Sequence, residues 1–345
     1  MERKLVSIQK VLALDPIEGA DKIEVATVLG WKVVVKKGDF KVGDAGCFFE
    51  VDSLLPRTSW SEFLDTKGNK KMRIKTIRLR KQISQGLLLP LSILPEGSSF
   101  NEEDDVTEVL GVVKYEPPED NTGKWGFNIG KRKSTFPSHL CPKTDEMRIQ
   151  SSPKLLKEFE GLLVAFTTKV DGTSATFVKG EDEYHVCSRN MSISAPEDSE
   201  KKSVYWEMHD RYNIKKILEN VGPFAIQGEV AGPGIQSNRM GLSDIDLFVF
   251  NVYNVVNKKR LGFQEFLDFC SLFNLKTVPV EKTNLLFSGF TVDDLVRFSN
   301  GVYQPSGHRR EGIVIRPMVE TYSEYLRGSL SVKVINPLYS LETDS

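Results

Sequence analysis

The chain has 345 residues, of which 40% are hydrophobic and 27% charged, and its formal net charge is −1. This composition is typical of a soluble globular protein of two domains and excludes a strongly charged disordered chain. Because 46 basic residues face 47 acidic ones, the chain is no general polycation, and nucleic-acid binding would need a local basic patch.

The sequence lacks the features of a membrane or secreted protein. No apolar run approaches the roughly 18 residues of a membrane helix, and the N-terminus has no signal segment. We therefore expect an intracellular monomer, cytoplasmic or nuclear.

A zinc site is not expected, because the cysteines lie far apart and no histidine stands at ligand spacing. We expect reduced thiols at Cys47, Cys141, Cys187 and Cys270.

The N-terminal region alternates apolar and polar residues at the period of strands. Such runs cover residues 5–8, 23–28, 31–35 and 46–51, and turn signals separate them. Short strands at this spacing predict a small barrel or sandwich. Residues 15–26 also resemble the opening of tRNA-binding OB-fold modules. We therefore predict an OB-fold-like RNA-binding module over residues 1–115.

A basic run extends from Lys67 to Lys81, with no acidic residue after Asp65. In an extended strand Arg73 and Lys75 would lie on one face, and Arg78 and Arg80 on the other. A bulge between the two pairs would bring all four onto one surface. The run could be a solvated edge strand that its charges protect from aggregation. We favour a groove that follows RNA phosphates. The candidate RNA-binding residues are Arg73, Lys75, Arg78 and Arg80.

The composition shifts to proline, glycine and charged residues over residues 116–137, which predicts a linker. The second domain is then expected over residues 138–345. Apolar residues at helical spacing predict helices over 204–221 and 263–273. A third helix is expected to start after Thr291 as its N-cap and to run through Phe298.

A candidate nucleophile follows a short apolar run. Residues 162–166 read as a buried strand, so Lys169 would stand at its end. Asp171 lies two residues on, and Gly172 would let the backbone turn close to a ligand. An ordinary solvated Asp-Gly turn is the alternative.

Three later strands each carry one charge among apolar neighbours. Glu229 lies within residues 226–230, Glu311 begins residues 311–316, and Lys333 lies within residues 329–334. Charges in such strands need partners, and a bound anion together with a metal ion would supply them. Phe248 and Phe250 share one face of a further strand, as core residues or as a stacking surface.

These strings occur in the order of a known superfamily. Lys-x-Asp-Gly, Gly-Glu, the aromatic strand, Glu-Gly-Ile-Val-Ile-Arg and Val-Lys are similar to motifs I, III, IIIa, IV and V of the covalent nucleotidyltransferases. Ser188-Arg189-Asn190 resembles motif Ia, and residues 143–150 look like the segment before the nucleophile in RNA ligases of the RNA ligase 2 type. The resemblance covers residues 143 to 340.

The resemblance implies an α+β fold. An N-terminal OB-like β-barrel would precede a nucleotidyltransferase domain of antiparallel sheets flanked by helices. Only a dozen residues follow Lys333, so the OB-like module stands in front, as in one RNA ligase branch. Many relatives have two lysines one residue apart in motif V, whereas Ser331 and Ile335 flank Lys333 here. Arg316 or a lysine of the first domain could supply the second phosphate contact.

The implied activity is that of an ATP-dependent RNA ligase. It would seal 3′-OH and 5′-phosphate RNA ends through a lysyl-AMP and an AMP-capped RNA, with ATP and Mg²⁺ or Mn²⁺. A DNA ligase, a GTP-dependent capping enzyme and a non-catalytic RNA-binding OB protein remain alternatives. The implied catalytic residues are Lys169, Asp171, Glu229, Glu311 and Lys333, with Asp171, Glu229 and Glu311 as metal ligands. The implied nucleotide contacts are Arg148, Thr168, Lys169, Arg189, Glu229, Phe250 and Lys333, with Phe248 as second choice for stacking.

Overall fold

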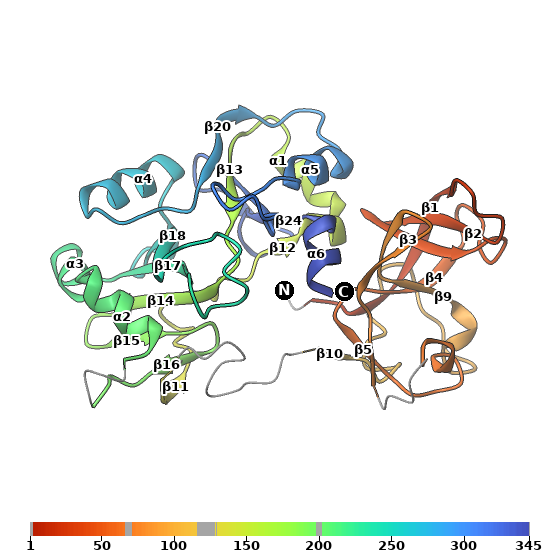
Figure 1. Ribbon diagram of the computed structural model, residues 1–345, viewed down its shortest axis with the longest axis horizontal. Helices are drawn as coiled ribbons and strands as arrows, with labels where there is room; N and C mark the ends of the chain where they lie inside the picture. The colour runs from red at the N-terminus through yellow and green to blue at the C-terminus, as the bar shows by residue number, and fades with distance from the viewer. Residues whose placement is uncertain (1–2, 66–70, 116–127, 129, 198–201, 345) are drawn as a thin grey trace. The chain divides into compact units, whose positions relative to one another are not determined.

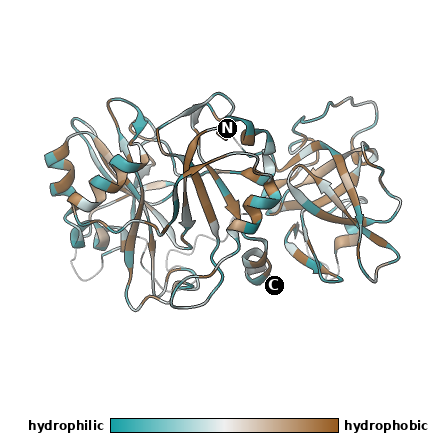
Figure 2. Cartoon of the chain, turned by 90° about the horizontal axis from the view of Figure 1, so that it is seen from above, coloured by the Kyte–Doolittle hydropathy of each residue, from teal (hydrophilic) through white to brown (hydrophobic). Residues whose placement is uncertain are grey.

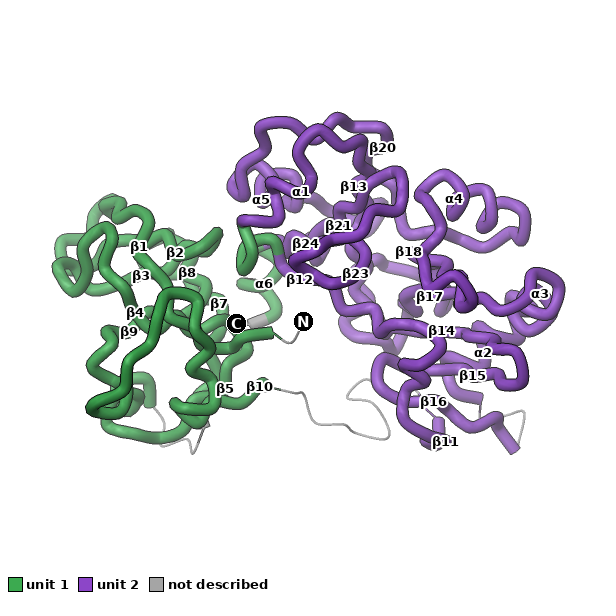
Figure 3. Tube along the Cα trace, turned by 180° about the vertical axis from the view of Figure 1, so that it is seen from behind, with its two compact units in different colours: residues 1–118, 149–153, 337–345 green, residues 119–148, 154–336 purple. Residues whose placement is uncertain are grey.

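The computed structural model describes residues 3–65, 71–115, 128, 130–197 and 202–344. The chain forms two compact units, drawn in different colours in Figure 3. The first comprises residues 1–118, 149–153 and 337–345, and the second comprises residues 119–148 and 154–336. This division differs from the predicted second domain of 138–345, because residues 149–153 and 337–345 belong to the first unit.

The two added segments have contacts within the first unit that explain this assignment. The Gly30 N–H donates to the Gln150 carbonyl at 2.8 Å. Helix α6 (Pro337–Asp344) packs against the hairpin of β7 (Thr76–Leu79) and β8 (Gln82–Gln85). The predicted linker, 116–137, lies largely outside the described residues, but its end forms an edge strand, β11 (Arg132–Thr135).

The first unit is built on a five-stranded antiparallel sheet, visible in Figure 1 in red and orange. Its order is β3-β2-β1-β4-β9, with bounds Trp31–Lys36, Ile23–Val28, Val6–Pro16, Ala45–Phe49 and Leu87–Pro90. A second, three-stranded sheet joins β10 (Val113–Lys114), β5 (Ser53–Pro56) and β6 (Lys71–Arg73). Alternate residues face inward, and two buried clusters form around Trp31 and Phe49. The expected all-β module is confirmed.

The second unit contains two larger sheets. The seven-stranded sheet has the order β11-β16-β15-β14-β17-β18-β19, with further bounds Met191–Ile193, Tyr184–Cys187, Thr173–Lys179, Phe224–Ala231, Asp246–Asn254 and Lys259–Arg260. The five-stranded sheet has the order β12-β24-β21-β13-β20, with bounds Met147–Arg148, Val332–Ile335, Gly312–Pro317, Leu163–Lys169 and Val280–Leu286. A short ribbon pairs β22 (Tyr322–Ser323) with β23 (Gly328–Ser329). Apart from β12–β24, the described pairs of named strands are antiparallel.

Helices cover the seven-stranded sheet and bury its apolar face. The main core cluster joins sheet residues such as Phe177 and Val249 with Met208, Leu218 and Phe266 of three helices. Figure 2 shows the same division, with hydrophobic colour concentrated on the strands and hydrophilic colour on outer turns and loops. These helices are α2 (Val204–Arg211), α3 (Ile214–Val221) and α4 (Phe263–Leu272); α1 (Leu156–Phe159) and α5 (Val292–Ser299) lie elsewhere in the unit.

The predicted helices are found, with one difference. The expected single helix over 204–221 is two helices, because Asn213 has φ 50° and ends the regular turn between α2 and α3. Thr291 caps α5 as predicted, and its side chain accepts a hydrogen bond from the Asp294 N–H. All four cysteines are buried and free. No described helix is long and apolar enough to span a membrane.

The chain passes from the five-stranded to the seven-stranded sheet through a short turn after Lys169. Strand β13 of the five-stranded sheet ends at Lys169, and β14 of the seven-stranded sheet begins at Thr173. Residues from both sheets can therefore meet at Lys169. The predicted α+β class, with a module of OB type before antiparallel sheets flanked by helices, is confirmed.

Candidate active site

Lys169 is paired with a carboxylate from the neighbouring strand. In the β13–β21 ladder Lys169 lies opposite Gly312, so Glu311 stands beside it. The Lys169 Nζ donates a hydrogen bond to Glu311 Oε2 at 2.6 Å. The two side chains are 26% and 20% exposed. This is a partly desolvated ion pair at the junction of two sheets, not a solvated turn.

Gly172 brings the strand that carries Glu229 next to this pair. A Cβ at Gly172 would lie 2.3 Å from the Val230 carbonyl oxygen and 2.9 Å from Glu229 Cγ. In the ladder of β14 and β17, Ser174 lies opposite Glu229. The sequence predicted that this glycine allows close backbone approach to a ligand. The structure shows that the approach is to β17.

The charges in this cluster shift one another's protonation. Burial raises the pKa of Glu229 to about 8; Lys169 opposes the shift, whereas Glu311 and Asp171 add to it. Burial alone would lower the pKa of Lys169, but Glu311, Glu229 and Asp171 outweigh it, so its pKa is raised. One ammonium therefore lies among three acidic side chains. The cluster carries more negative charge than its own lysine neutralises.

This surplus of carboxylates suits a cation by donor chemistry, since Mg²⁺ and Mn²⁺ prefer oxygen ligands. However, within the described ranges no three His, Cys, Asp or Glu side chains are grouped to hold one metal ion directly. The Lys169 ammonium occupies the hydrogen-bonding position at Glu311, and the prediction for Asp171, Glu229 and Glu311 was a hydrated ion. The residues fit a hydrated ion, which carries its own water ligands.

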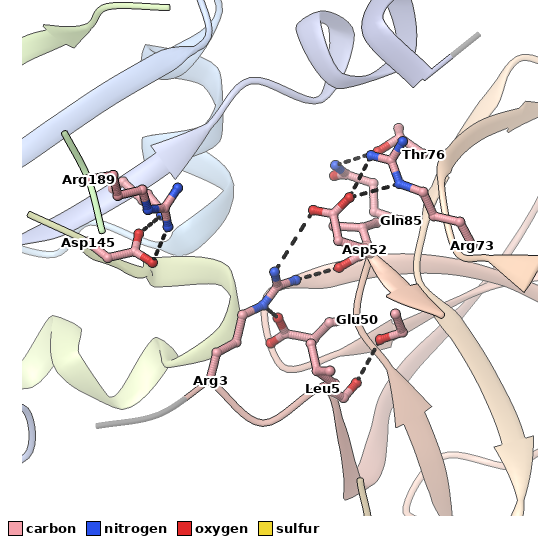
Figure 4. Close-up of polar contacts among 12 residues, drawn as sticks. Arg3, Leu5, Glu50, Asp52, Arg73, Thr76, Gln85, Asp145 and Arg189 are labelled. Carbon is pink, nitrogen blue, oxygen red and sulfur yellow. Dashed lines mark hydrogen bonds and ion pairs between the residues drawn. The ribbon is translucent and has the colours of Figure 1, made fainter. Parts of the chain in front are cut away.

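Two predicted nucleotide contacts meet at Asp145, namely Lys333, expected at the α-phosphate, and Arg189, expected at the ribose. The Asp145 carboxylate accepts hydrogen bonds from Lys333 Nζ at 2.7 Å and from Arg189 Nη2 at 2.8 Å. Figure 4 shows Arg189 and Asp145 facing each other. Arg148 lies opposite Lys333 in the parallel β12–β24 pair. Burial lowers the pKa of Lys333 to about 8; Asp145 opposes the shift, and the cations of Arg148 and Lys169 add to it. The structure thus brings together three of the predicted nucleotide contacts.

The two aromatic candidates differ in accessibility. Phe248 is 9% exposed and belongs to an apolar cluster with Val170 and Tyr303. Phe250 is half-buried and packs against the edge of that cluster. A shift in the β17–β18 register leaves Phe250 without a partner opposite it. Phe250 therefore has exposed ring surface available for stacking, whereas Phe248 is buried in the core.

Two predicted contacts lie away from the cluster. Thr168 neighbours Lys169 in β13, so its side chain faces the opposite side of the sheet, where its hydroxyl donates to Glu281. Arg316 is 5% exposed and donates to the carbonyls of Leu261 at 2.6 Å and Phe250 at 3.4 Å. Both side chains have partners within the fold, and Arg316, the candidate for the second phosphate contact of motif V, is buried.

Sequence reasoning missed Tyr303. Its hydroxyl donates to the Lys169 carbonyl at 2.9 Å and accepts from the Asp171 N–H at 3.1 Å. Burial raises the pKa of Tyr303, so the hydroxyl keeps its proton at neutral pH. No local pattern could have indicated this residue, because its partners lie more than a hundred positions away.

The basic run of the first unit is divided between two strands. Arg73, in β6, donates to Asp52 at 2.6 Å and stacks over the Tyr115 ring at 4.2 Å. Asp52 also lies near Arg3, within the network drawn in Figure 4. Arg73 is thus engaged inside the unit, which weakens the prediction that it binds RNA. Lys75, Arg78 and Arg80 are exposed, while residues 66–70 lie outside the described residues.

A unit of OB type followed by two sheets that meet at a lysine among carboxylates defines a nucleotidyltransferase of the lysine-dependent class. Comparisons with known proteins agree with this assignment. An OB-fold domain model matches residues 5–91, and the RNA ligase family model matches residues 163–335. The chain belongs to the RNA ligase family, which confirms the resemblance seen in the sequence.

Solved structures of a Naegleria gruberi RNA ligase resemble the whole chain. A lysine-to-alanine mutant with ATP and Mn has 30% identity and a TM-score of 0.87, covering 99% of this chain and 100% of that one. A lysine-to-methionine mutant with AMP and Mn has 31% identity, a TM-score of 0.87 and the same coverage. The enzyme with PPi has 31% identity and a TM-score of 0.86, covering 99% of each chain. No curated protein matches the chain.

Proposed function

We propose that this RNA ligase uses ATP to join RNA 3′-OH and 5′-phosphate ends in three nucleotidyl transfers. In the first, the Lys169 amine attacks the α-phosphorus of ATP, a nitrogen–phosphorus bond forms, and pyrophosphate leaves. The AMP then passes to an RNA 5′-phosphate and frees Lys169. Finally, a 3′-OH attacks that 5′-phosphate, and AMP leaves. The observation that carries the proposal is the Lys169 ammonium held 2.6 Å from Glu311 Oε2, with Glu229 and Asp171 in electrostatic reach.

The nucleophile must first lose a proton. At an ordinary lysine pKa of about 10.4, roughly one amine in 2,500 is neutral at pH 7. The surrounding carboxylates raise the pKa of Lys169 and make this fraction smaller still. When bound near Asp171, Glu229 and Glu311, a divalent cation supplies positive charge that lowers this pKa and neutralises phosphate charge. The relatives solved with ATP or AMP together with Mn support Mg²⁺ or Mn²⁺ as this cation.

The remaining side chains hold the nucleotide in this proposal. The half-buried ring of Phe250 stacks on adenine, and Arg189 and Glu229 contact the ribose. Lys333 contacts the α-phosphate, and Arg148 the other nucleotide phosphates or the RNA 5′ end. Arg189 and Lys333 share Asp145 as a partner, so bound nucleotide would replace this carboxylate, with the α-phosphate at Lys333 and the ribose at Arg189.

RNA binding by the first unit is the second part of the proposal. Its OB-fold match and the exposed side chains of Lys75, Arg78 and Arg80 support contact with RNA phosphates. Arg73 contributes less, because Asp52 already neutralises it. If removing these charges leaves the RNA affinity unchanged, the surface is merely solvated and does not bind RNA.

The reaction is tested with α-labelled nucleotides and defined RNA ends. Incubation with labelled ATP or GTP should leave a label on the denatured protein with ATP only. A nicked RNA duplex with 3′-OH and 5′-phosphate should be sealed, whereas one with 3′-phosphate and 5′-OH should not. A parent and a Lys169→Ala variant that seal RNA equally would refute the lysyl-AMP mechanism.

A further inference from the structure

The Tyr303 hydroxyl has three backbone partners. It donates to the Lys169 carbonyl at 2.9 Å, and it accepts from the N–H groups of Asp171 at 3.1 Å and Glu311 at 3.4 Å. A tyrosine hydroxyl offers one donor and accepts through its lone pairs. The arrangement therefore uses the donor and two acceptor positions of a single oxygen.

These three partners belong to two segments that are distant in sequence. Lys169 ends β13 and Asp171 follows it, whereas Glu311 directly precedes β21, more than 130 residues later. Their side chains form the charged cluster. Lys169 pairs with Gly312 in the β13–β21 ladder, whereas Asp171 lies beyond the end of that ladder. Tyr303 joins both backbones through one atom. Tyr303 is 4% exposed and packs with Val170, so the oxygen has little freedom to move.

The loop that carries Tyr303 is itself held in place. Tyr303 N–H donates to the His308 carbonyl at 2.8 Å, and the Gly307 N–H donates to the Tyr303 carbonyl at 2.9 Å. The Ser306 hydroxyl donates to the Arg239 carbonyl at 2.6 Å and ties the loop to a second segment. These bonds make the loop a fixed support for the hydroxyl.

We propose that Tyr303 is a positioning residue for lysyl-AMP formation. Its hydroxyl fixes the nucleophile segment, Lys169 to Asp171, against Glu311, so that the amine and the carboxylates keep their mutual geometry. This inference rests on the function proposed above. Attack on the α-phosphorus depends on the position of the Lys169 amine, and a displacement of about 1 Å can cost about 100-fold in rate. Sealing of an AMP-capped RNA does not use that amine as a nucleophile.

The test compares two steps in Tyr303→Phe, which removes the hydroxyl and keeps the ring. Lysyl-AMP formation is measured in single turnover at saturating ATP and Mn²⁺ and should slow by about 10- to 100-fold. Sealing of preformed AMP-capped RNA should change by less than about threefold. Tyr212→Phe is the matched control, since it also removes a hydroxyl hydrogen bond, to Asp246, outside the charged cluster. Both steps should keep the parent rate in that control.

Equal slowing of both steps in Tyr303→Phe, or no slowing of either, would overturn the positioning role. Should this variant fail to fold in a thermal melt, Ser306→Ala decides, because it loosens the loop and leaves the Tyr303 hydroxyl intact. It should slow lysyl-AMP formation by about two- to tenfold while sealing is unchanged, and parent rates in both steps would overturn the inference. A parent that forms no lysyl-AMP would instead refute the proposed function.

Discussion

Replacing Glu311 with glutamine should raise the reactivity of the free Lys169 amine but slow its reaction with ATP. The pair is held by one charge-assisted hydrogen bond of 2.6 Å. Such bonds contribute about 1.5–3 kcal/mol, and the lower end applies because the side chains are 26% and 20% exposed. Glu311 raises the pKa of Lys169, so Glu311→Gln should lower that pKa and raise the neutral fraction of the amine by about tenfold.

The assay is competitive amine labelling without divalent ions, read by peptide mass spectrometry as a function of pH. Lys169 should become about tenfold more reactive in Glu311→Gln below its pKa. Lys131, whose side chain is 83% exposed, serves as the internal reference. With ATP and Mn²⁺, lysyl-AMP formation should nevertheless fall by about 100-fold or more, because a carboxylate that holds the cation is lost. Unchanged or reduced labelling of Lys169 would refute the electrostatic reasoning.

Three further predictions follow from the same geometry. Gly172→Ala should destabilise the protein by about 1–3 kcal/mol in urea unfolding, because its Cβ would lie 2.3 Å from the Val230 oxygen; unchanged stability would contradict this. The pKa of Glu229 is raised to about 8 in the folded state, against about 4.3 in the unfolded chain. Between these two pH values the folded state holds a proton that the unfolded state has lost. The stability of the protein in EDTA should therefore fall as the pH rises from about 4.3 to about 8. Glu229→Gln should flatten that fall, and an unaltered pH profile would exclude this cause. Arg78→Ala with Arg80→Ala should reduce the salt slope of log RNA affinity by about 1.4, and an unchanged slope would remove both from the RNA surface.

The strands around the site could be predicted because their apolar patterns are local. Strand β13 is buried along most of its length, and its charged end at Lys169 stands out against that background. Glu229 and Lys333 were found for the same reason, as single charges in apolar strands. The cap at Thr291 is equally local, since its partner lies three residues away. Periodicity and capping thus sufficed for the elements and for most of the charged cluster.

The alternation of side chains along strands and the contacts between residues distant in sequence account for the differences between prediction and structure. The resemblance implied that Thr168 contacts the nucleotide, but its side chain faces the opposite side of the sheet from Lys169, because neighbours in a strand alternate. Arg73 was grouped with its basic neighbours, whereas its partner Asp52 comes from a segment 21 residues earlier. The role of Tyr303 depends on contacts across more than 130 positions. The pairings of Arg73 and Tyr303 leave no periodic signal in the sequence.

The central claim is that Lys169 becomes the phosphorus nucleophile in the carboxylate cluster. Intact-mass spectrometry of the protein after incubation with ATP and Mn²⁺ tests it most directly. The account predicts a gain of one AMP, located on Lys169 by peptide mapping, removed by pyrophosphate and absent in Lys169→Ala. An AMP adduct that persists in Lys169→Ala, or RNA sealing by a parent that never acquires one, would contradict it.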